Sequence, residues 1–313
     1  MKPDREAPRE AGAVILAGGD GTRLAPLTRH IAGHDLPKQF CAILGGETLL
    51  EQTYRRVSLS ISPERTVTVL RRAHERFYYP LISEASVRNQ AIQPANRGTA
   101  AAILFGLLRL SVLRPIGTVA VFPSDHYISD DHIFMRHVDA AISAVASLPV
   151  KIVLLGIPAD RPESEYGWIE PAEQLTQPSA GLEPIFRIRR FWEKPSPHLA
   201  VDLWKRRLLW NSFVMVGEVG ALLDLFAKMI PQVYNSFAQI KDLLNTSLET
   251  DAIEELFADP PSVNFSEAIL ATCRSELSVL PTIGVDWNDL GDPSRVMATL
   301  AKIGRRPGWL SAL

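Results

Sequence analysis

The chain has 313 residues, of which 46% are hydrophobic and 22% are charged, a balance typical of globular proteins that argues against a disordered or fibrous chain. Lys and Arg number 33 against 35 Asp and Glu, so the formal net charge is −2, whereas nucleic-acid-binding proteins usually carry a strongly basic surplus. Cys41 and Cys273 are too few for a disulfide framework and match no zinc-binding spacing. We therefore expect no nucleic-acid partner.

The N-terminal segment, residues 1–10, mixes both charge signs, and the apolar run that follows it stops at Gly18-Gly19, so it lacks the form of a signal peptide. The longest other apolar stretch, Ala100 to Leu108, is far shorter than the roughly 18–20 residues that a membrane span needs. We therefore expect a flexible tail over residues 1–12, one folded domain over residues 13–313, a cytoplasmic location and no membrane partner.

The first half of the chain alternates short apolar runs with longer amphipathic stretches. Four runs are predicted to be strands: Ala13–Ala17, Thr66–Leu70, Thr118–Phe122 and Lys151–Gly156. Three longer stretches are predicted to be helices: Thr48–Ser58, Thr99–Leu110 and His132–Ser147. This alternation predicts a Rossmann-like α/β fold, in which a mixed, mostly parallel sheet is flanked by helices and binds ligands beyond the carboxyl ends of its strands.

In the second half the pattern loosens. Partly exposed strands are predicted over Trp168–Pro171, Ile185–Trp192 and Phe213–Gly217. Helices are predicted again over His198–Leu208 and Glu218–Ile230. Because no linker-like composition separates the two halves, we expect a smaller lobe folded onto the first sheet.

A glycine-rich segment follows the first predicted strand: residues 16–24 read LAGGDGTRL. Glycines leave backbone N–H groups unshielded, so a loop there can wrap a polyphosphate, and Arg23 adds a forked cation that suits phosphate oxygens. The segment matches neither the Walker A pattern nor GxGxxG. A tight strand-to-helix turn without a ligand is the alternative, and the length of the whole string argues against it.

This string and several later blocks resemble the sugar-phosphate nucleotidyltransferases. In chain order the later blocks are PLT at 26–28, PKQF at 37–40, QPANRGTA at 93–100, PSDH at 123–126, EYGWIE at 165–170, FWEKP at 191–195, WNS at 210–212 and VDWNDLG at 285–291. The variant PKQF is most similar to the mannose-1-phosphate guanylyltransferase branch. The resemblance covers nearly the whole chain, and the ordered blocks are more specific together than any one alone.

The resemblance implies a nucleotidyltransferase catalytic domain that transfers a nucleoside monophosphate from an NTP to a sugar-1-phosphate and releases pyrophosphate. It favours GTP and mannose-1-phosphate as the substrates, which would give GDP-mannose. The second pKa of a phosphate monoester lies near about 6, so the attacking oxygen is largely ionised at neutral pH and needs no general base. The expected partners are these two small molecules, and the resemblance allows a homodimer.

The resemblance also assigns individual residues of these blocks to the two substrates and to a metal ion. For the nucleotide, the resemblance implies Leu16, Ala17, Gly18, Gly19, Gly21, Thr22, Arg23, Gln93, Arg97 and Thr99. For the sugar phosphate, it implies Asp125, Gly167, Glu193, Lys194 and Asn211. The expected catalytic cations are Arg23 and Lys38 at the nucleotide phosphates and Lys194 at the sugar phosphate. Mg²⁺ is the expected cofactor, bound by Asp125 and Asp289, with Asp286 or Asp292 as alternatives to Asp289.

Departures from the family pattern bear on specificity. Gln93 stands where guanylyltransferases carry Glu, and its amide offers one acceptor oxygen beside a donor NH₂, which suits uracil or thymine at least as well as guanine. Phe213 replaces a glycine and Ser266 an aspartate near the expected sugar pocket. The alternatives are a uridylyl-, thymidylyl- or adenylyltransferase for another hexose-1-phosphate, or a non-catalytic relative that binds a nucleotide-sugar and regulates a partner.

Overall fold

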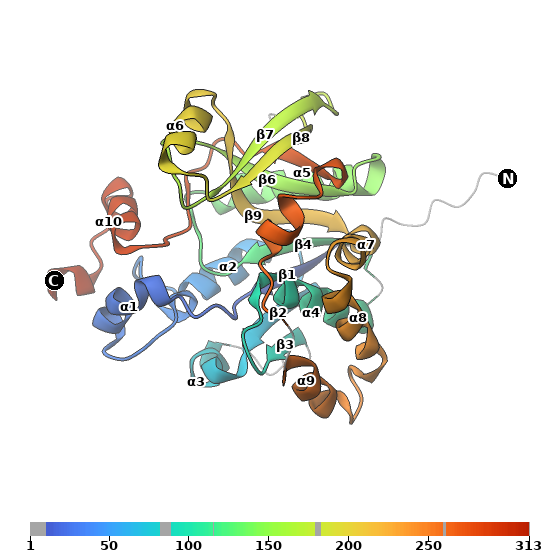
Figure 1. The fold of residues 1–313 in the computed structure, drawn as a ribbon. Coiled ribbons are helices and arrows are strands. Elements are labelled where there is room, and N and C mark those ends of the chain that lie inside the picture. Colours follow the sequence, from blue (N-terminus) through green and yellow to red (C-terminus); the bar gives the residue numbers. More distant parts are fainter. Residues whose placement is uncertain (1–10, 82–88, 115, 179–182, 259–260, 313) are drawn as a thin grey trace.

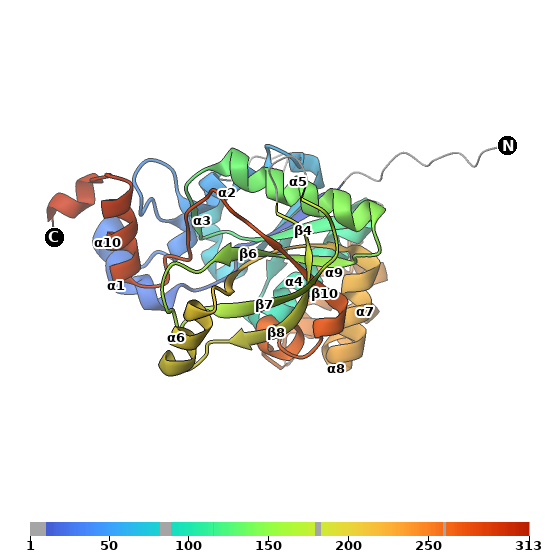
Figure 2. The same cartoon turned by 90° about the horizontal axis from the view of Figure 1, so that it is seen from above.

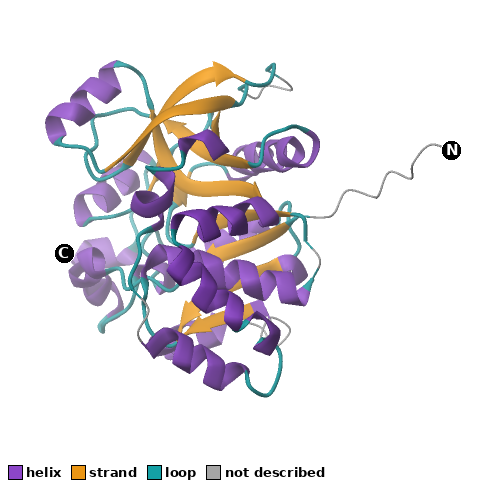
Figure 3. Ribbon diagram, turned by 45° about the vertical axis from the view of Figure 1, so that its right-hand side comes forward, coloured by secondary structure: helices purple, strands orange, loops and turns teal. Residues whose placement is uncertain are grey.

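The computed structural model describes residues 11–81, 89–114, 116–178, 183–258 and 261–312. Within them, nine strands form one sheet with helices on both faces (Figure 1, Figure 3). These strands are β1 (Gly12–Leu16), β2 (Thr66–Arg71), β3 (Gln90–Gln93), β4 (Thr118–Pro123), β6 (Ile152–Pro158), β7 (Gly167–Gln174), β8 (Phe186–Glu193), β9 (Leu209–Glu218) and β10 (Leu277–Pro281). A separate antiparallel pair consists of β5 (Tyr127–Ile128) and β11 (Trp287–Asn288).

The strand order places the parallel part of the sheet at one side. In the order β3-β2-β1-β4-β9-β6-β10-β8-β7, the first four strands are parallel to one another, and β6 is parallel to β10. Strands β9 and β8 run antiparallel to their neighbours, and β7 pairs with β9 as well as with β8, so this end of the sheet folds back on itself. The expected mixed, mostly parallel sheet is confirmed, and the carboxyl ends of β1, β2 and β4 meet at one edge.

Helices cover both faces of the sheet and its ligand-facing edge. They are α1 (Ala25–Ala32), α2 (Leu49–Val57), α3 (Glu75–Tyr78), α4 (Gly98–Leu113), α5 (Asp131–Ser147), α6 (Pro197–Lys205), α7 (Val219–Met229), α8 (Pro231–Gln239), α9 (Glu249–Ala258) and α10 (Pro293–Lys302). Polar caps explain where several of them begin. Thr48 and Glu51 form a capping box before α2, and the side chains of Asp130, Ser196 and Asp292 accept backbone N–H groups at the starts of α5, α6 and α10.

Apolar cores lie on the two faces of the sheet. On one face, α4 packs on β1 and β2 at close range, since a Cβ at Gly106 would lie 2.5 Å from Val14 Cγ1 and 2.9 Å from Val69 Cγ2. The other face is covered by α5 and α2. A smaller core that includes Leu27 and Val296 joins α1 to α10, which lie side by side (Figure 2). The C-terminal helix is thereby held close to the loop that follows β1.

Most of the predicted elements are present with shifted ends. β3 and β10 had not been predicted, and β9 is longer than the expected Phe213–Gly217 because its first residues continue the pairing with β6. The predicted smaller lobe corresponds to the β7–β8 hairpin with α6 beside it (Figure 1). The expected tail falls mostly outside the described residues, and β1 begins at Gly12. Throughout the described part of the chain, no helix is long and apolar enough to cross a membrane.

Candidate active site

A cavity of about 410 Å³ lies at the carboxyl ends of β1 and β4, where it also meets the β7–β8 hairpin. Its lining comes from segments that are far apart in the sequence. The predicted site residues that line it are Leu16, Gly18, Gly19, Gln93, Thr99, Asp125, Gly167, Glu193, Asn211 and Asp289. Because α/β sheets bind ligands at this edge, the cavity is the candidate active site.

The glycine-rich loop after β1 forms one wall of the cavity and is fixed from both sides. On one side, Gln39 Nε2 donates to the carbonyl oxygens of Ala17 at 2.9 Å and Gly19 at 2.8 Å. On the other, Asp20 forms an ion pair with Arg71 at the end of β2. The loop therefore holds its shape through protein contacts, with the backbone of Gly19 left exposed.

Lys38 is nearly buried and bonds to protein oxygens. Its Nζ lies 3.1 Å from Asp125 Oδ2 and donates to the carbonyl oxygens of Asp289 at 2.5 Å and Leu290 at 3.4 Å. The lysine thus joins the PKQF block, the end of β4 and the turn after β11. In this geometry, the lysine that we expected at the nucleotide phosphates forms an ion pair with Asp125.

Asp289 lies in the tight turn between β11 and α10. Its Oδ1 accepts hydrogen bonds from Tyr166 Oη at 3.1 Å, the backbone N of Gly291 at 2.8 Å and Arg295 Nη1 at 2.9 Å. Its Oδ2 lies 3.1 Å from the same Arg295 nitrogen. Burial alone would raise the pKa of Asp289, but His126, Lys38 and Arg295 beside it outweigh burial and lower that pKa. The carboxylate is therefore ionised at neutral pH.

Gly167, Glu193 and Asn211 meet in the part of the cavity formed by the smaller lobe. A Cβ on Gly167 would lie 3.0 Å from Glu193 Oε2 and 3.2 Å from Asn211 Cβ, so glycine leaves the room that these side chains occupy. Asn211 Oδ1 accepts from the backbone N of Phe213 at 3.1 Å, which fixes the amide and leaves its NH₂ group as a donor. Burial is the main cause that raises the pKa of Glu193.

Phe213 narrows the same part of the cavity. Its φ of +63° lies in the left-handed region that favours glycine, and its ring packs against Phe265 at a centroid distance of 6.4 Å. Nearby, the pairing of β6 with β9 shifts register between Leu154 and Gly156. Phe213, which stands where the family has a glycine, therefore lines the cavity.

Gln93 and Thr99 line the side of the cavity next to the parallel strands. Gln93 ends β3 and is buried, and its Nε2 has no hydrogen-bond partner in the described structure. Thr99 Oγ1 accepts from the backbone N of Phe265 at 2.9 Å. Gly98, before it, has φ +83°, and a Cβ there would lie 2.4 Å from the carbonyl oxygen of Val263. Gln93 therefore places a buried amide NH₂ group without a hydrogen-bond partner in the wall of the cavity.

Arg97 differs from its expected position at the nucleotide. Its Nη2 donates to the carbonyl oxygens of Phe257 at 2.9 Å and Ala258 at 2.6 Å, which end α9. Cationic groups stabilise the carbonyl end of a helix. The guanidinium thus anchors α9, an element that had not been predicted, and it does not line the cavity in the described structure.

The other two predicted cations are exposed. Arg23 forms an ion pair with Glu165 at 3.3 Å, with more than half of its side chain open to solvent. Lys194 has φ +45°, and its backbone N donates to the carbonyl oxygen of Tyr166 at 3.2 Å. Both are next to the cavity, since Arg23 pairs with the lining residue Glu165 and Lys194 directly follows the lining residue Glu193. Three further predicted residues shape the loop after β1 without forming part of the described lining: Ala17, Gly21 and Thr22.

Several side chains without a predicted role shape the site. Gln39 fixes the glycine-rich loop, and the ring of Tyr166 lies 4.6 Å from the guanidinium carbon of Arg295. Burial lowers the pKa of His126 to about 4, so this histidine is neutral at neutral pH. Gln39, Tyr166 and His126 belong to sequence blocks that resemble the family. Arg295 had no such signal, because it lies after the last block that resembles the family and outside every predicted helix.

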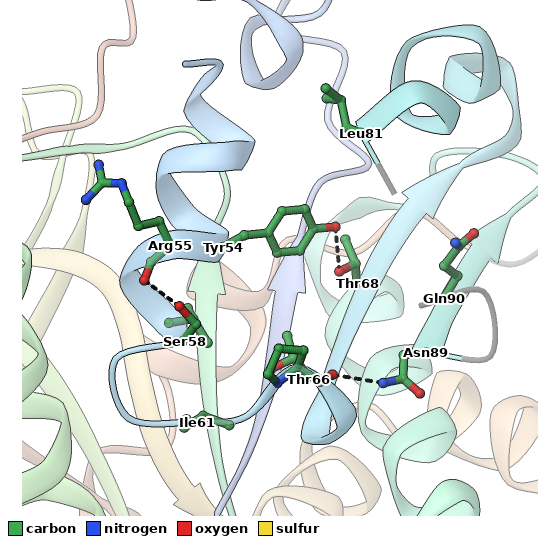
Figure 4. Close-up of a pocket in the computed structure, with 11 residues that line it drawn as sticks. Tyr54, Arg55, Ser58, Ile61, Thr66, Thr68, Leu81, Asn89 and Gln90 are labelled. Carbon is green, nitrogen blue, oxygen red and sulfur yellow. Dashed lines mark hydrogen bonds between the residues drawn. The ribbon is translucent and has the colours of Figure 1, made fainter. Parts of the chain in front are cut away.

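A second cavity, of about 360 Å³, lies near the amino end of β2 (Figure 4). Several of its polar groups pair with one another or with the backbone: Tyr54 Oη and Thr68 Oγ1 are 2.9 Å apart, and Asn89 Nδ2 donates to the carbonyl oxygen of Pro63 at 2.9 Å. Among its described lining residues the charged one is Arg55, which is paired elsewhere. This cavity gathers no reactive groups, so the first one remains the candidate active site.

A family model described as nucleotidyl transferase matches residues 12–305. The chain belongs to this family. Among curated relatives of this nucleotidyl transferase, the alginate biosynthesis protein AlgA of Pseudomonas syringae pv. tomato is 28% identical over 92% of the chain. Mannose-1-phosphate guanylyltransferase 2 of Escherichia coli O157:H7 is 28% identical over 89% of it. The match covers 58% of either relative, so the chain spans little more than half of their length.

Solved structures agree with the nucleotidyl transferase fold. A mannose-1-phosphate geranyltransferase from Thermus thermophilus has a TM-score of 0.75 and 28% identity, over 90% of this chain and 76% of that one. A UDP-glucose pyrophosphorylase complexed with UDP-glucose has a TM-score of 0.58 and 15% identity, over 95% of this chain and 100% of that one. At that identity the second likeness concerns the fold alone.

Nucleotidyl transferases commonly use a divalent metal, and the residues of this site fit one. Asp125 and Asp289 bring two carboxylates to the same cavity, and oxygen ligands suit hard divalent cations. Neither alternative ligand is as well placed, since Asp286 pairs with Lys302 at 2.7 Å and Asp292 caps α10. The described residues contain no group of three or more His, Cys, Asp or Glu side chains arranged for a metal. Phosphate oxygens and water commonly complete such a shell.

Proposed function

We propose that this protein transfers a nucleoside monophosphate from an NTP to a sugar-1-phosphate and releases pyrophosphate, with GTP and mannose-1-phosphate as the leading pair of substrates. One observation carries the proposal: a single cavity joins the glycine-rich loop to Gly167, Glu193 and Asn211, with Asp125 and Asp289 in its lining. The names of the guanylyltransferase relatives support the choice of substrates. A cytoplasmic location and a homodimer remain predictions.

In the proposed reaction, an oxygen of the sugar-1-phosphate attacks the α-phosphorus of the NTP. The bond from that phosphorus to the oxygen bridging to the β-phosphorus breaks, and pyrophosphate leaves. The attacking oxygen is already largely ionised at neutral pH, so no side chain has to remove a proton. When bound by Asp125 and Asp289, Mg²⁺ would neutralise phosphate charge.

The chain's own residues would bind and orient the two substrates. Backbone N–H groups of the glycine-rich loop suit the triphosphate, and the exposed cation Arg23 lies beside that loop. At the other end, the Glu193 carboxylate accepts from sugar hydroxyls and the Asn211 NH₂ group donates to another, which holds the sugar ring. Lys194, exposed directly after Glu193, would pair with the sugar phosphate.

Gln93 favours a second candidate pair, in which UTP or dTTP replaces GTP. Its buried Nε2 is an unpaired donor, and its amide can match the mixed donor and acceptor edge of uracil or thymine. A carboxylate in its place would accept from both N1–H and the 2-amino group of guanine. We therefore expect Gln93→Glu to raise the ratio of GTP to UTP turnover by about tenfold. Gln90→Glu, at the other end of β3, is the matched control and should leave the ratio unchanged.

The test of the proposed function is pyrophosphate release with Mg²⁺, using GTP, UTP, dTTP or ATP with mannose- or glucose-1-phosphate. Turnover chiefly with GTP and mannose-1-phosphate supports the leading pair, and a preference for another NTP moves the assignment to the alternative. Asp125→Asn should abolish most turnover, whereas Asp224→Asn on the exposed side of α7 should not. Absence of turnover with every pair, together with retained nucleotide-sugar binding, would instead support a non-catalytic relative.

A further inference from the structure

Arg295, on the first turns of α10, is buried among three carboxylates, each facing a different nitrogen of its guanidinium. Nη1 bonds to Asp289, Nη2 lies 3.0 Å from Glu163 Oε1, and Nε lies 3.1 Å from Asp292 Oδ2. The face of the guanidinium rests on the ring of Tyr166. A planar, forked cation can meet all of these groups at once, which an ammonium cannot do.

The two carboxylate oxygens of Asp289 have different numbers of hydrogen-bond donors. Oδ1 accepts from Tyr166, Gly291 and Arg295, which fills its hydrogen-bonding capacity. Oδ2 has Arg295 Nη1 as its described donor and so keeps capacity for another partner. Gly291 permits this packing, because a Cβ there would lie 2.6 Å from Asp289 Oδ2 and 2.7 Å from Arg295 Nη1. The carboxylate is thus held in one orientation.

We infer that Arg295 is a positioning residue, which orients Asp289 for a divalent cation and also limits how tightly that cation binds. It orients the carboxylate by completing the set of three donors to Oδ1 and by bonding Oδ2 with the same nitrogen, and its positive charge competes with a cation for Oδ2. The inference rests on the proposed function only in taking Asp289 as a cation ligand. Because Glu163 precedes β7, the same guanidinium also ties α10 to the smaller lobe.

The two effects of Arg295 oppose each other, and this makes the inference testable. Removing the guanidinium removes a positive charge next to Asp289, so a divalent cation should bind more tightly. It also leaves the carboxylate with donors to Oδ1 alone, from Tyr166 and Gly291, so Oδ2 is held less firmly, the reacting groups should be less well placed and turnover should fall. A merely structural arginine would lower stability and turnover without tightening the binding of a cation.

The experiment compares Arg295→Met and Arg295→Lys with the unaltered chain. Binding of Mn²⁺ without nucleotide is measured by electron paramagnetic resonance, kcat and KM by pyrophosphate release, and folding by thermal unfolding. For Arg295→Met we expect about tenfold tighter Mn²⁺ binding and at least roughly a tenfold lower kcat. For Arg295→Lys, which keeps the charge but loses the fork, we expect Mn²⁺ affinity within about twofold of the unaltered chain and a lower kcat. Arg206→Met, which breaks an ion pair with Glu170 in the smaller lobe, is the control and should leave Mn²⁺ affinity unchanged.

A folded Arg295→Met chain with unchanged or weaker Mn²⁺ binding would overturn the inference. If that variant does not fold, Arg295→Lys decides, because full turnover by the lysine variant would show that the fork positions nothing. If no pair of substrates gives turnover in the unaltered chain, the proposed function fails, and the Mn²⁺ titrations still test the competition at Asp289.

Discussion

Lys38 and Asp125 form an ion pair, with Lys38 Nζ 3.1 Å from Asp125 Oδ2, at the carboxyl end of β4. The lysine side chain is nearly buried, whereas about a third of the aspartate side chain is exposed. The same Nζ donates to the carbonyl oxygen of Asp289. One lysine therefore links both expected metal ligands, although they stand far apart in the sequence.

Lys38→Met should lower both stability and turnover. It leaves Asp125 partly buried without its counter-charge, and we expect a loss in the free energy of unfolding on the order of 2 kcal/mol. Turnover should fall at least about tenfold because the turn that holds Asp289 loses its donor. Urea unfolding and pyrophosphate release measure the two effects. An unchanged free energy of unfolding would show that the ion pair contributes nothing to the fold.

The sequence predicted the elements whose signals are local. The apolar runs before the glycine-rich loop and before Asp125 are strands buried on both faces, and the positions of the ligand-facing residues follow from their ends. β3 was not predicted because it has only four residues and both its ends are glutamine, so it lacks an apolar run. β10 also went unpredicted, although its core residues are buried between β6 and β8.

The partners of long cationic side chains could not be predicted, because they depend on elements distant in the sequence. Arg97 reaches the end of α9 and Lys38 reaches the turn after β11, each across more than a hundred residues. Arg295 lies outside every predicted block and helix, and its burial becomes apparent only when α10 packs against the smaller lobe. Residue types could be assigned to the site, but not the bonds among them.

Glu193 should make sugar binding sensitive to acid. Burial raises the pKa of this carboxyl above its ordinary value of 4.5, so it takes up a proton at a higher pH than an ordinary glutamate. The protonated group loses acceptor capacity, and KM for the sugar-1-phosphate should rise as the pH falls. Glu193→Gln should have a raised KM at neutral pH that changes less with pH. The ionisation of the substrate phosphate affects both proteins equally, so the difference between their KM profiles isolates Glu193. Parallel profiles would contradict the prediction.

Glu249 should stabilise the fold at neutral pH but not in acid. Although burial opposes it, hydrogen bonds from Arg109 and from the backbone of Asn245 lower the pKa of Glu249 below 4.5. A depressed carboxyl pKa gives stability that is present above the unfolded-state pKa and is lost as the pH falls through the folded-state pKa. Glu249→Gln should cost about 2 kcal/mol at pH 7, less than a fully buried pair, because Glu249 is partly exposed.

Urea unfolding at pH 7 and at successively lower pH checks this prediction. The difference between the unaltered chain and Glu249→Gln should shrink as the pH falls below 4.5. Glu254→Gln is the matched control, since its ion pair with Arg72 is well exposed and should contribute less than about 1 kcal/mol. Equal costs for the two substitutions at pH 7 would show that burial of the pair with Arg109 adds nothing.

Phe213→Gly should widen the choice of sugar without unfolding the protein. Glycine removes the strain of a φ of +63°, about 1–2 kcal/mol, which offsets the loss of a partly buried ring. The vacated space adjoins Asn211, so we expect the ratio of kcat/KM for N-acetylglucosamine-1-phosphate to that for mannose-1-phosphate to rise about tenfold. Phe213→Ala is the control: it opens the same space but keeps the strained backbone, so it should change the ratio similarly and be less stable than the glycine variant by about 1 kcal/mol. A folded glycine variant with an unchanged ratio would mean that the ring does not contact the sugar.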